Sequence, residues 1–332
     1  MDLLITGGAG FIGSTIASAA LDAGHRPIIL DNLVTGRREF TRGRTFYEGD
    51  ICDRELVHRI LDENPNIEAV IHCAALIVVP DSVARPGDYY RANVVKTLDL
   101  VEALSERGVD RLIFSSSASI YEPDDDFSVD ESSALAPVSP YAFTKVVVEQ
   151  MLADLSEASD LRVLSLRYFN PIGADPQFRT GLQIKSPSHA LGKLIEARTA
   201  HTPFSVTGDD FPTRDGTGIR DYVHVWDLAQ AHLAALEHFD EALGSERHTV
   251  INLGTGEGTT VKELVHAFED VTGESLEVQV APRRPGDAAG AFTRSDKAER
   301  LLGWTAQHSL REGIADSLAW FDRRGEILPD LA

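Results

Sequence analysis

Near its N-terminus the chain reads Leu3-Leu4-Ile5-Thr6-Gly7-Gly8-Ala9-Gly10-Phe11-Ile12-Gly13, an apolar stretch that runs into a glycine-rich turn. The helical pattern of residues 12–23 follows and stops at Gly24. Glycine carries no Cβ, so its backbone can approach a diphosphate closely, and a helix N-terminus offers free N–H groups to such an anion. The order of strand, turn and helix therefore predicts a phosphate-binding unit that opens an α/β fold.

The rest of the first half repeats this alternation of strand and helix. Amphipathic segments at 56–61 and 94–104 separate the later strands. Near-continuous apolar strands between helices predict an α/β fold with a Rossmann-type, doubly wound parallel sheet covered on both faces. The expected strands are residues 28–31, 45–47, 69–72, 112–115, 163–168 and 250–253.

The second half changes character after residue 170. Residues 171–220 are rich in glycine, proline, aspartate and threonine, and the capping box Ser309-x-x-Glu312 begins the last helix. We expect residues 1–170, with 221–254 returning to them, to form a dinucleotide-binding domain. Residues 171–220 and 255–332 are expected to form a smaller C-terminal α+β domain that holds a substrate over the sheet.

Composition excludes several classes of function. The 332 residues carry 31 Lys and Arg against 52 Asp and Glu, a net charge of −21, so nucleic acid and anionic membranes are poor partners. The longest apolar run, residues 69–79, is about half the length needed to span a bilayer. Only Cys52 and Cys73 occur, in no metal or disulfide pattern, and the N-terminus lacks a basic signal region. We expect a cytoplasmic protein that binds no metal, no nucleic acid and no membrane.

Asp31 ends the second predicted strand, about twenty residues after the glycine turn. A carboxylate there accepts hydrogen bonds from ribose hydroxyls and repels a 2′-phosphate, which favours NAD over NADP. Arg37 and Arg38 lie near enough to keep that preference moderate. The pair Asp50-Ile51, at the end of the third strand, is expected to flank the adenine. The sequence therefore predicts NAD as the cofactor.

Tyr141 and Lys145 lie four residues apart at the start of a predicted helix, so they share one face of it. The strand at 112–115 runs into Ser115-Ser116-Ser117, where the carboxyl edge of the sheet faces the cofactor; Ser115 and Ser116 could instead satisfy strand-end backbone groups. An ammonium about 5 Å away lowers a tyrosine pKa from about 10 to about 8 at an effective dielectric of about 20. These residues predict proton abstraction from a hydroxyl coupled to hydride transfer, with Ser117 relaying the proton.

The motifs Thr6–Gly13, Ser115–Ser117 and Tyr141-x-x-x-Lys145 resemble those of the extended short-chain dehydrogenase/reductase superfamily. Within it, the chain is similar to the UDP-glucose 4-epimerase family. That similarity covers essentially the whole chain in collinear order, and it implies an NAD-dependent isomerase that oxidises C4 of a UDP-sugar to a ketone and reduces it from the other face. The motifs that carry it are Asp31-Asn32-Leu33 and the segments 167–171, 215–225 and 281–287.

The resemblance also implies roles for individual residues. Tyr141 is the base, Lys145 its electrostatic partner and Ser117 the proton relay, while guanidinium groups clamp the diphosphate in spite of the negative net charge. A homodimer is expected, with the helices near 94–104 and 141–155 paired across a two-fold axis. The implied cofactor contacts are Gly7, Gly10, Phe11, Ile12, Gly13, Asp31, Asn32, Asp50, Ile51, Ala74, Asn93, Ser115, Tyr141, Lys145 and Tyr168. The implied substrate contacts are Ser117, Tyr141, Asn170, Ser188, Arg220, Arg284, Asp287 and Ala291.

Three positions depart from the pattern of the family. Ile77 stands where the family has lysine, Glu122 where it has glycine, and Pro187-Ser188-His189 where it has Asn-Asn-Leu near the uridine. These changes leave the nucleotide base and the sugar open. The resemblance also implies that position 291 borders the sugar beside C2. The small Ala291 there would leave room for an N-acetyl group, so N-acetylated substrates are included in the expectation.

Other functions remain open. One alternative is a UDP-uronate 4-epimerase, and another is a nucleotide-sugar dehydratase or reductase of the same superfamily. A 4,6-dehydratase needs an Asp-Glu pair beside the reactive serine, where this chain has Ala118-Ser119. The last alternative is a non-catalytic NAD-binding regulator, against which the presence of Ser117, Tyr141 and Lys145 counts.

Overall fold

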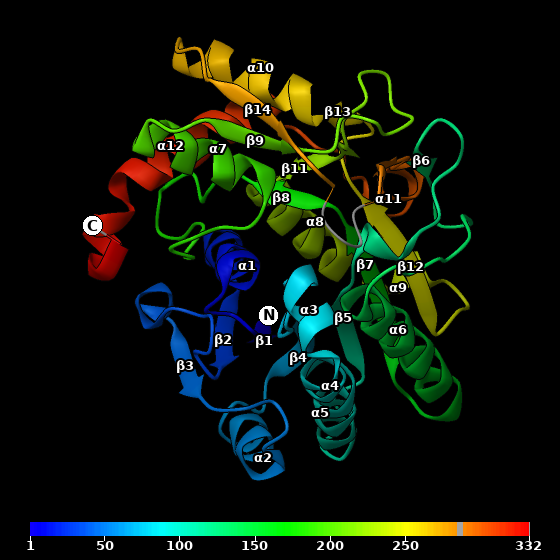
Figure 1. The fold of residues 1–332 in the computed structure, drawn as a ribbon. Helices are drawn as coiled ribbons and strands as arrows, with labels where there is room; N and C mark the ends of the chain where they lie inside the picture. Colours follow the sequence, from blue (N-terminus) through cyan, green and yellow to red (C-terminus); the bar gives the residue numbers. More distant parts are fainter. Residues whose placement is uncertain (284–287, 332) are drawn as a thin grey trace.

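A seven-stranded parallel sheet forms the centre of the molecule in the computed structural model, which describes residues 1–283 and 288–331 (Figure 1). The strand order is β3-β2-β1-β4-β5-β7-β12, so the chain winds outward from β1 in both directions. This is the predicted Rossmann-type sheet. Its strands are β1 (Asp2–Thr6), β2 (Arg26–Asp31), β3 (Thr45–Glu48), β4 (Ile67–His72), β5 (Arg111–Ser115), β7 (Arg162–Tyr168) and β12 (His248–Leu253).

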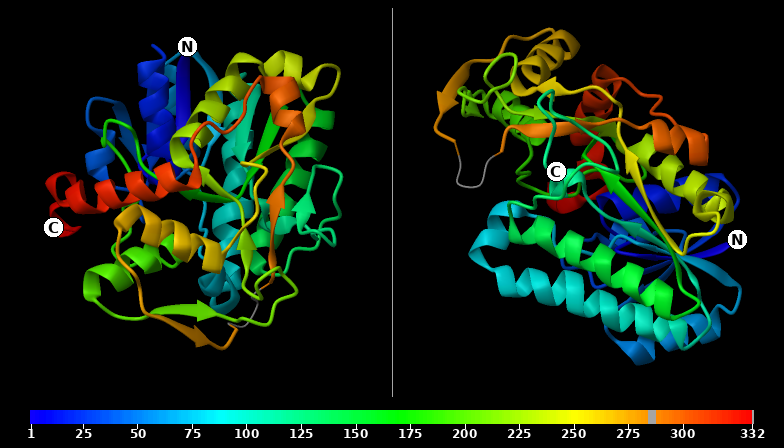
Figure 2. Two further views of the ribbon diagram at one scale, coloured as in Figure 1. Left: turned by 90° about the horizontal axis from the view of Figure 1, so that it is seen from above. Right: turned by 90° about the vertical axis from the view of Figure 1, so that its right-hand side faces the viewer.

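Helices cover both faces of this sheet (Figure 2). Each face has its own apolar core because the strands are buried on both sides, with Leu3 and Ile5 on one side and Leu4 on the other. One face is covered by α1 (Phe11–Asp22), α8 (Val225–Glu237), α9 (Phe239–Leu243) and α11 (Asp296–Leu302). The other is covered by α2 (Arg54–Glu63), α5 (Lys96–Ser105) and α6 (Pro140–Ala158).

The C-terminal half adds a separate apolar core, which includes Leu194, Phe268 and Ile314. Figure 1 draws its elements together at the top, away from α2, α5 and α6 at the bottom. They are β8 (Asn170–Ile172) paired with β11 (Tyr222–His224), β9 (Phe204–Thr207) paired with β14 (Val278–Ala281), α7 (Ala190–Ala200), α10 (Val261–Thr272) and α12 (Leu310–Ile327).

Short elements join the two halves. A four-stranded sheet has the order β13 (Thr259–Thr260), β10 (Ile219–Arg220), β15 (Gly290–Thr293) and β6 (Ser128–Val129). After β4 come α3 (Val79–Ala84), α4 (Pro86–Tyr89) and a π-helical turn (Tyr90–Val95). Three 3-10 turns complete the described elements: Arg38–Thr41, Ala118–Ile120 and Pro329–Leu331.

The predicted strands and the capping box are confirmed, because each depends on a local pattern. In the box, the Ser309 hydroxyl accepts from Glu312 N at 3.3 Å, and Ser309 N donates to the Glu312 carboxylate at 2.7 Å. The sequence missed α8, since nine of its thirteen residues are buried and it presents no separate polar stripe. No helix in the described part of the chain is long and apolar enough to cross a membrane.

Candidate active site

The glycine turn between β1 and α1 packs tightly against the strand end of β4. Gly7 has φ +69°, and a Cβ there would lie 2.7 Å from the backbone nitrogen of Ala74. A Cβ on Gly13 would lie 2.4 Å from the carbonyl oxygen of Gly7. A Cβ on Gly10 meets only that same oxygen, at 3.3 Å. Glycine is therefore needed at Gly7 and Gly13 for packing, and Gly10 faces a more open side of the turn.

The first turn of α1 presents free donors. Among residues 1–283 and 288–331, no acceptor is found for the backbone N–H groups of Phe11, Ile12 and Gly13. Gly10 begins the helix without a side-chain cap. Unsatisfied N–H groups at a helix N-terminus bind phosphate oxygens, so the turn fits the diphosphate of a dinucleotide.

Asp31 lies at the carboxyl end of β2, beside this turn. Its carboxylate is 6% exposed and accepts from Ala9 N at 3.0 Å and from Leu33 N at 2.8 Å. Burial raises the pKa of Asp31, and these two backbone bonds work against that rise. The arginines close to it in sequence are both engaged, Arg37 with Asp330 at 2.9 Å and Arg38 with Glu48. This arrangement is consistent with the predicted preference for NAD, whose ribose carries no 2′-phosphate.

Asp50 and Asn32 lie at the ends of adjacent strands. Asn32 Nδ2 donates to the Asp50 carboxylate at 3.2 Å, and Lys96 on α5 donates to the same carboxylate. Burial raises the pKa of Asp50, but the hydrogen bonds from Lys96, Cys52 and Asn32 outweigh it, so the pKa is lowered. Ile51 is buried in the core on the α2 face of the sheet. Hydrogen bonds therefore link Asn32, Asp50 and Lys96 at the sheet edge where the adenine was predicted.

Asn93 secures the loop after β4. Its side-chain amide accepts from Leu76 N at 2.8 Å and donates to Leu76 O at 3.0 Å and to Thr144 Oγ1 at 3.0 Å. Both donor positions of the amide are therefore used within the protein. Asn93 thus ties the loop that contains Ala74 to α6, close to the predicted catalytic residues.

Ser117 and Tyr141 meet at the carboxyl end of β5. Ser117 opens the turn Ala118–Ile120: its Oγ accepts from Ser119 N at 3.2 Å and lies 2.9 Å from Ser119 Oγ. Tyr141 stands in the first turn of α6, where Ser139 caps the helix by accepting from Ala142 N at 3.2 Å. Burial raises the pKa of Tyr141 and the Ser117 side chain opposes that rise, so the two side chains are neighbours. The predicted base and the predicted relay therefore lie side by side.

Lys145 lies one turn further along the same face of α6. Its Nζ donates to the carbonyl oxygen of Ser115 at 2.7 Å and lies 4.7 Å from the ring centre of Phe114. Burial lowers the pKa of Lys145 to about 8, while Cys73 and Glu149 act in the opposite direction. The ammonium is thus mostly charged at pH 7 and sits in a buried, aromatic environment.

The pKa of Tyr141 differs from the sequence expectation. Burial raises this pKa, the Ser117 side chain opposes the rise, and Tyr89 adds to it. The sequence argument relied on the charge of Lys145, which is not among the causes that act on this pKa, and it left out the desolvation of a buried phenol. Burial therefore makes Tyr141 a weaker acid than free tyrosine.

The Ser115 hydroxyl belongs to a buried network that the sequence did not indicate. His232 Nδ1 lies 2.8 Å from Leu228 O, and burial lowers the pKa of His232 to about 4, so Nδ1 carries the single proton of a neutral ring. His232 Nε2 therefore accepts from Ser115 Oγ, at 3.1 Å. The same Oγ lies 3.1 Å from Cys73 Sγ, and burial raises the pKa of Tyr168 while Ser115 beside it opposes that rise. The Ser115 hydroxyl is thus engaged by other side chains and not by the strand-end backbone groups considered as its alternative.

The predicted substrate contacts are distributed over the C-terminal elements. Arg220 Nη1 donates to Ile219 O at 2.7 Å and to Ala289 O at 2.9 Å, and Arg220 pairs in register with Ala291. Asn170 lies in β8, and Ser188 is exposed just before α7. Arg284 and Asp287 lie outside the described residues.

Ala291, a predicted substrate contact on β15, lies near the predicted catalytic residues. It packs against an apolar cluster that includes Ala118 and Ala142, the chain neighbours of Ser117 and Tyr141. A side chain on β15 therefore reaches the side of the molecule where the predicted base lies.

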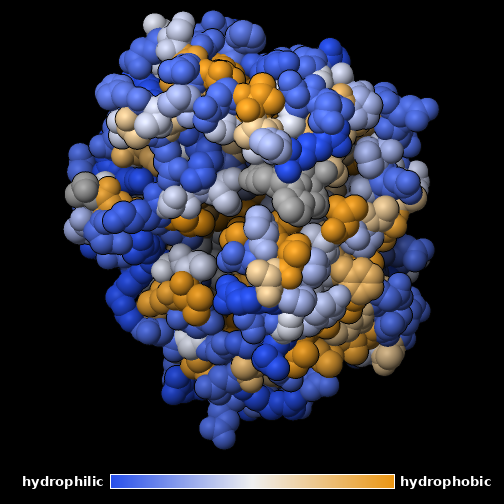
Figure 3. Space-filling view, in the orientation of Figure 1, coloured by the Kyte–Doolittle hydropathy of each residue, from blue (hydrophilic) through white to orange (hydrophobic). Residues whose placement is uncertain are grey.

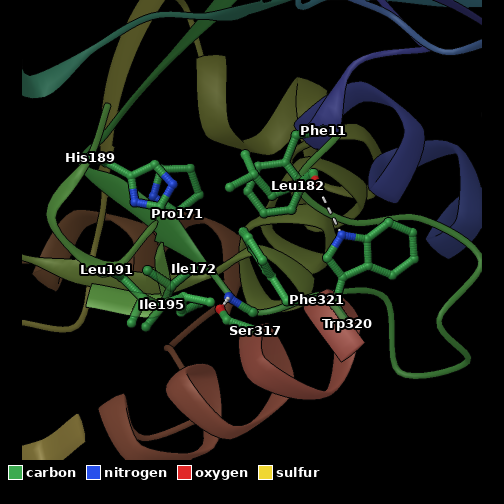
Figure 4. Close-up of a pocket in the computed structure, with 11 residues that line it drawn as sticks. Phe11, Pro171, Ile172, Leu182, His189, Leu191, Ile195, Ser317, Trp320 and Phe321 are labelled. Atoms are coloured by element: carbon green, nitrogen blue, oxygen red, sulfur yellow. Dashed lines mark hydrogen bonds between the residues drawn. The ribbon is translucent and has the colours of Figure 1, made fainter. Parts of the chain in front are cut away.

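An apolar pocket connects the glycine turn with the C-terminal half (Figure 4). Phe11, from the start of α1, faces Trp320 and Phe321 of α12 across it. Trp320 Nε1 donates to Leu182 O at 2.9 Å. His189 also lines the pocket and caps α7 by accepting from Gly192 N at 3.2 Å. His189 is therefore structural, as is His224, which caps α8 in the same way.

Comparison with known proteins places the chain in a family. A sequence model of the NAD-dependent epimerase/dehydratase family matches residues 3–254. The chain belongs to this family.

Within the described residues, no three His, Cys, Asp or Glu side chains gather in a way that could hold a metal ion.

Relatives within the family are similar along the whole chain. The UDP-glucose 4-epimerase of Bacillus subtilis is 43% identical over 338 residues, and the match covers 96% of each chain. The UDP-glucose 4-epimerase of Stenotrophomonas maltophila, solved with bound NAD and formylated UDP-arabinopyranose, superposes with a TM-score of 0.92 at 38% identity, covering 98% of this chain and 99% of that one. The enzyme of Bifidobacterium longum, solved with NAD+ and UDP, gives 0.90 at 35% identity, covering 97% and 98%.

Proposed function

We propose that the chain is an NAD-dependent nucleotide-sugar 4-epimerase that interconverts UDP-glucose and UDP-galactose. The observation that carries the proposal is the meeting of Tyr141, Ser117 and Lys145 at the carboxyl end of β5. The glycine turn is close to this group, because Cys73 connects the two. Cys73 N donates to Thr6 O at 3.0 Å, and Cys73 Sγ lies 3.1 Å from Ser115 Oγ. Relatives named UDP-glucose 4-epimerase, matched over nearly their whole length, support the same reading.

The proposed reaction requires this arrangement to move one proton and to allow one reversible oxidation at C4 of the sugar. Tyr141, as phenolate, takes the proton of the C4 hydroxyl, directly or through Ser117. NAD, when bound, would supply the acceptor for the hydride of C4 and the donor for its return. The C4–H bond breaks as the C4–O bond becomes a carbonyl, so a 4-keto sugar forms. After the ketone has turned in the site, C4 is reduced on its opposite face and Tyr141 gives the proton back, which leaves no net oxidation.

Lys145 makes this base usable near neutral pH. Burial alone raises the pKa of Tyr141, so the phenolate needs positive charge beside it. Lys145 carries such a charge, and its bond to the Ser115 carbonyl fixes where the ammonium sits. The positive nicotinamide ring adds to this effect when NAD is bound.

We assign NAD binding to residues 1–170 with 221–254, and substrate binding to 171–220 with 255–332. The glycine turn and α1 would hold the diphosphate of NAD, Asp31 the ribose, and Asn32, Asp50 and Ile51 the adenine side. Ala74, Asn93, Ser115 and Tyr168 would shape the nicotinamide side. The Asn93 and Ser115 side chains are committed within the protein, so we assign them a supporting role.

The substrate is a UDP-sugar held by local positive charge. Arg220 and Arg284 would neutralise the diphosphate, which the net charge of −21 otherwise repels. Asn170, Ser188 and Asp287 would contact the nucleotide. Ala291 would border the sugar and, being small, would admit an N-acetyl group as well.

A UDP-uronate 4-epimerase is the second candidate, and the relatives named UDP-glucose 4-epimerase do not favour it. A panel of UDP-glucose, UDP-N-acetylglucosamine and UDP-glucuronate separates the two. Conversion of UDP-glucose to its C4 epimer is the expected result. Conversion of the uronate alone would transfer the proposal to the second candidate, and conversion of none would contradict both.

We also propose a cytoplasmic homodimer that pairs α5 and α6 of each subunit. Figure 3 shows apolar side chains gathered at the lower right, where Figure 1 draws these helices. Phe143 on α6 is 45% exposed, Val95 before α5 is 51% exposed, and Tyr90 contacts Phe143 at 6.4 Å between ring centres. Two-fold pairing would bury these side chains as a four-helix bundle. Light scattering at micromolar concentration should show a dimer for the wild type and a monomer for Phe143→Glu. A monomeric wild type would contradict the proposal.

A further inference from the structure

Three side chains on one face of α6 hold the serine segment, residues 115–117. Tyr141 lies beside the third serine, which opposes the rise of its pKa by burial, and Lys145 donates to the carbonyl oxygen of the first at 2.7 Å. The carboxylate of Glu149 accepts from the hydroxyl of Ser116. The three helix residues follow one another at intervals of four, so they form one row along α6. The third member of this row is not needed by the proposed chemistry.

Glu149 is bound at the same time by Arg167 of β7. Arg167 Nε lies 2.9 Å and 3.1 Å from the two carboxylate oxygens of Glu149, and its Nη2 donates to the same carboxylate. Both side chains are only 6% exposed. A buried ion pair stabilises a fold little more than apolar residues of the same volume, because both charges lose their water. A doubly hydrogen-bonded pair does, however, hold its two side chains in one relative geometry.

Arg167 also holds the other end of the serine loop, which we define as residues 115–121. Its Nη1 donates to the hydroxyl of Tyr121 at 2.6 Å, and its guanidinium lies 4.9 Å from the centre of that ring. The Tyr121 hydroxyl donates in turn to Asn252 Oδ1 at 2.7 Å. The loop that carries Ser117 is therefore held by Glu149 at its start and by Arg167 at its end.

We propose that Glu149 and Arg167 are positioning residues, which hold the serine loop so that Ser117 stays in register with Tyr141. This inference rests on the proposed function, because that register matters only if these two residues move the proton. Neither positioning residue touches Tyr141 or Ser117 directly; they act through Ser116 and Tyr121. A displacement of about 1 Å in such a site lowers a rate by as much as about 100-fold.

A merely structural role for the pair predicts a different result. It would lower the melting temperature and leave kcat unchanged at temperatures where the protein stays folded. Two mild variants separate the roles, since each removes a single hydroxyl: Ser116→Ala at the start of the loop and Tyr121→Phe at its end. Ser156→Ala is the matched control, because Ser156 is equally buried on α6 and donates to Leu152 O at 2.7 Å, away from the loop.

The experiment measures kcat, KM and bound NAD at 25 °C, and the hydrogen exchange of the backbone amides of the serine loop. We expect kcat to fall about 10- to 100-fold in Ser116→Ala and Tyr121→Phe, with KM and NAD content unchanged and faster exchange in the loop. Ser156→Ala should match wild type in kcat, KM, bound NAD and hydrogen exchange. Glu149→Gln should repeat the loss; where it does not fold, the two hydroxyl variants decide.

The inference is overturned if kcat stays within twofold of wild type in both hydroxyl variants, or if Ser156→Ala loses as much. Unchanged exchange in the loop would overturn it as well. If wild-type protein converts no UDP-sugar, the proposed function fails instead, and the exchange measurement still decides whether the pair positions the loop.

Discussion

The ammonium nitrogen of Lys145 lies 2.7 Å from the carbonyl oxygen of Ser115, two residues before Ser117. This side chain stands one helical turn after Tyr141 on α6 and fixes the end of β5. Lys145→Met keeps most of the apolar stem and removes the charge. We expect kcat to fall about 100-fold, because a charge about 5 Å away contributes roughly 3 kcal/mol at an effective dielectric of about 20. Steady-state rates check this against the exposed Lys193→Met on α7; a loss below threefold contradicts the role.

Asp31 should determine the choice of dinucleotide. Asp31→Ala removes the acceptor for the ribose and the charge that repels a 2′-phosphate, so NAD should bind more weakly and the gap to NADP should narrow. Dissociation constants for both cofactors, measured by calorimetry, check the prediction. Asp160→Ala, exposed on the turn after α6, is the control. Equal affinity of the wild type for NAD and NADP would refute it.

Ala291 should determine which sugars are accepted. Wild type is expected to convert UDP-N-acetylglucosamine as well as UDP-glucose, and Ala291→Tyr should exclude the acetylated sugar by a steric clash. The ratio of kcat/KM for the two sugars measures this. Ala288→Tyr, at an exposed position three residues earlier, is the control. Ala291 is not the determinant if wild type already rejects the acetylated sugar or if the ratio does not move.

His232 should make stability depend on pH. Burial lowers its pKa in the folded protein from 6.5 to about 4. The unfolded chain therefore takes up a proton between pH 6.5 and 4 that the folded chain does not, and stability falls as pH falls through this window, by up to about 3 kcal/mol. His232→Gln does not titrate, so its free energy of unfolding should fall less between pH 7 and 4.5. Urea unfolding measures both slopes, with the exposed His266→Gln as control; equal slopes for wild type and His232→Gln contradict the prediction.

Local patterns in the sequence were sufficient to predict the central sheet and the shared helix of Tyr141 and Lys145. The run from Leu3 to Gly13 determines β1, the turn and α1 through neighbouring residues, and the spacing of Tyr141 and Lys145 places both on one helix face. Strands of two residues, such as β10 and β13, have no such local signal, because only pairing across the chain defines them. The sequence therefore could not predict the small four-stranded sheet.

The second part of the site depends on contacts between distant residues. His232 lies 117 residues from Ser115 and sits in a helix with little polar surface, so nothing in its neighbourhood marks it. Glu149 continues the spacing of Tyr141 and Lys145, a signal that could have found it, but its partner Arg167 comes from a different element. The desolvation that raises the pKa of Tyr141 also requires the folded structure.

The central claim is tested most directly by following UDP-galactose in the NMR spectrum with wild-type protein and with Tyr141→Phe, both loaded with NAD. Wild type should convert it to an equilibrium mixture with UDP-glucose. Tyr141→Phe lacks only the proton acceptor, so it should keep its NAD and be slower by about 10²- to 10⁴-fold. Absence of conversion by wild type, or a Tyr141→Phe rate within threefold of it, would contradict the account.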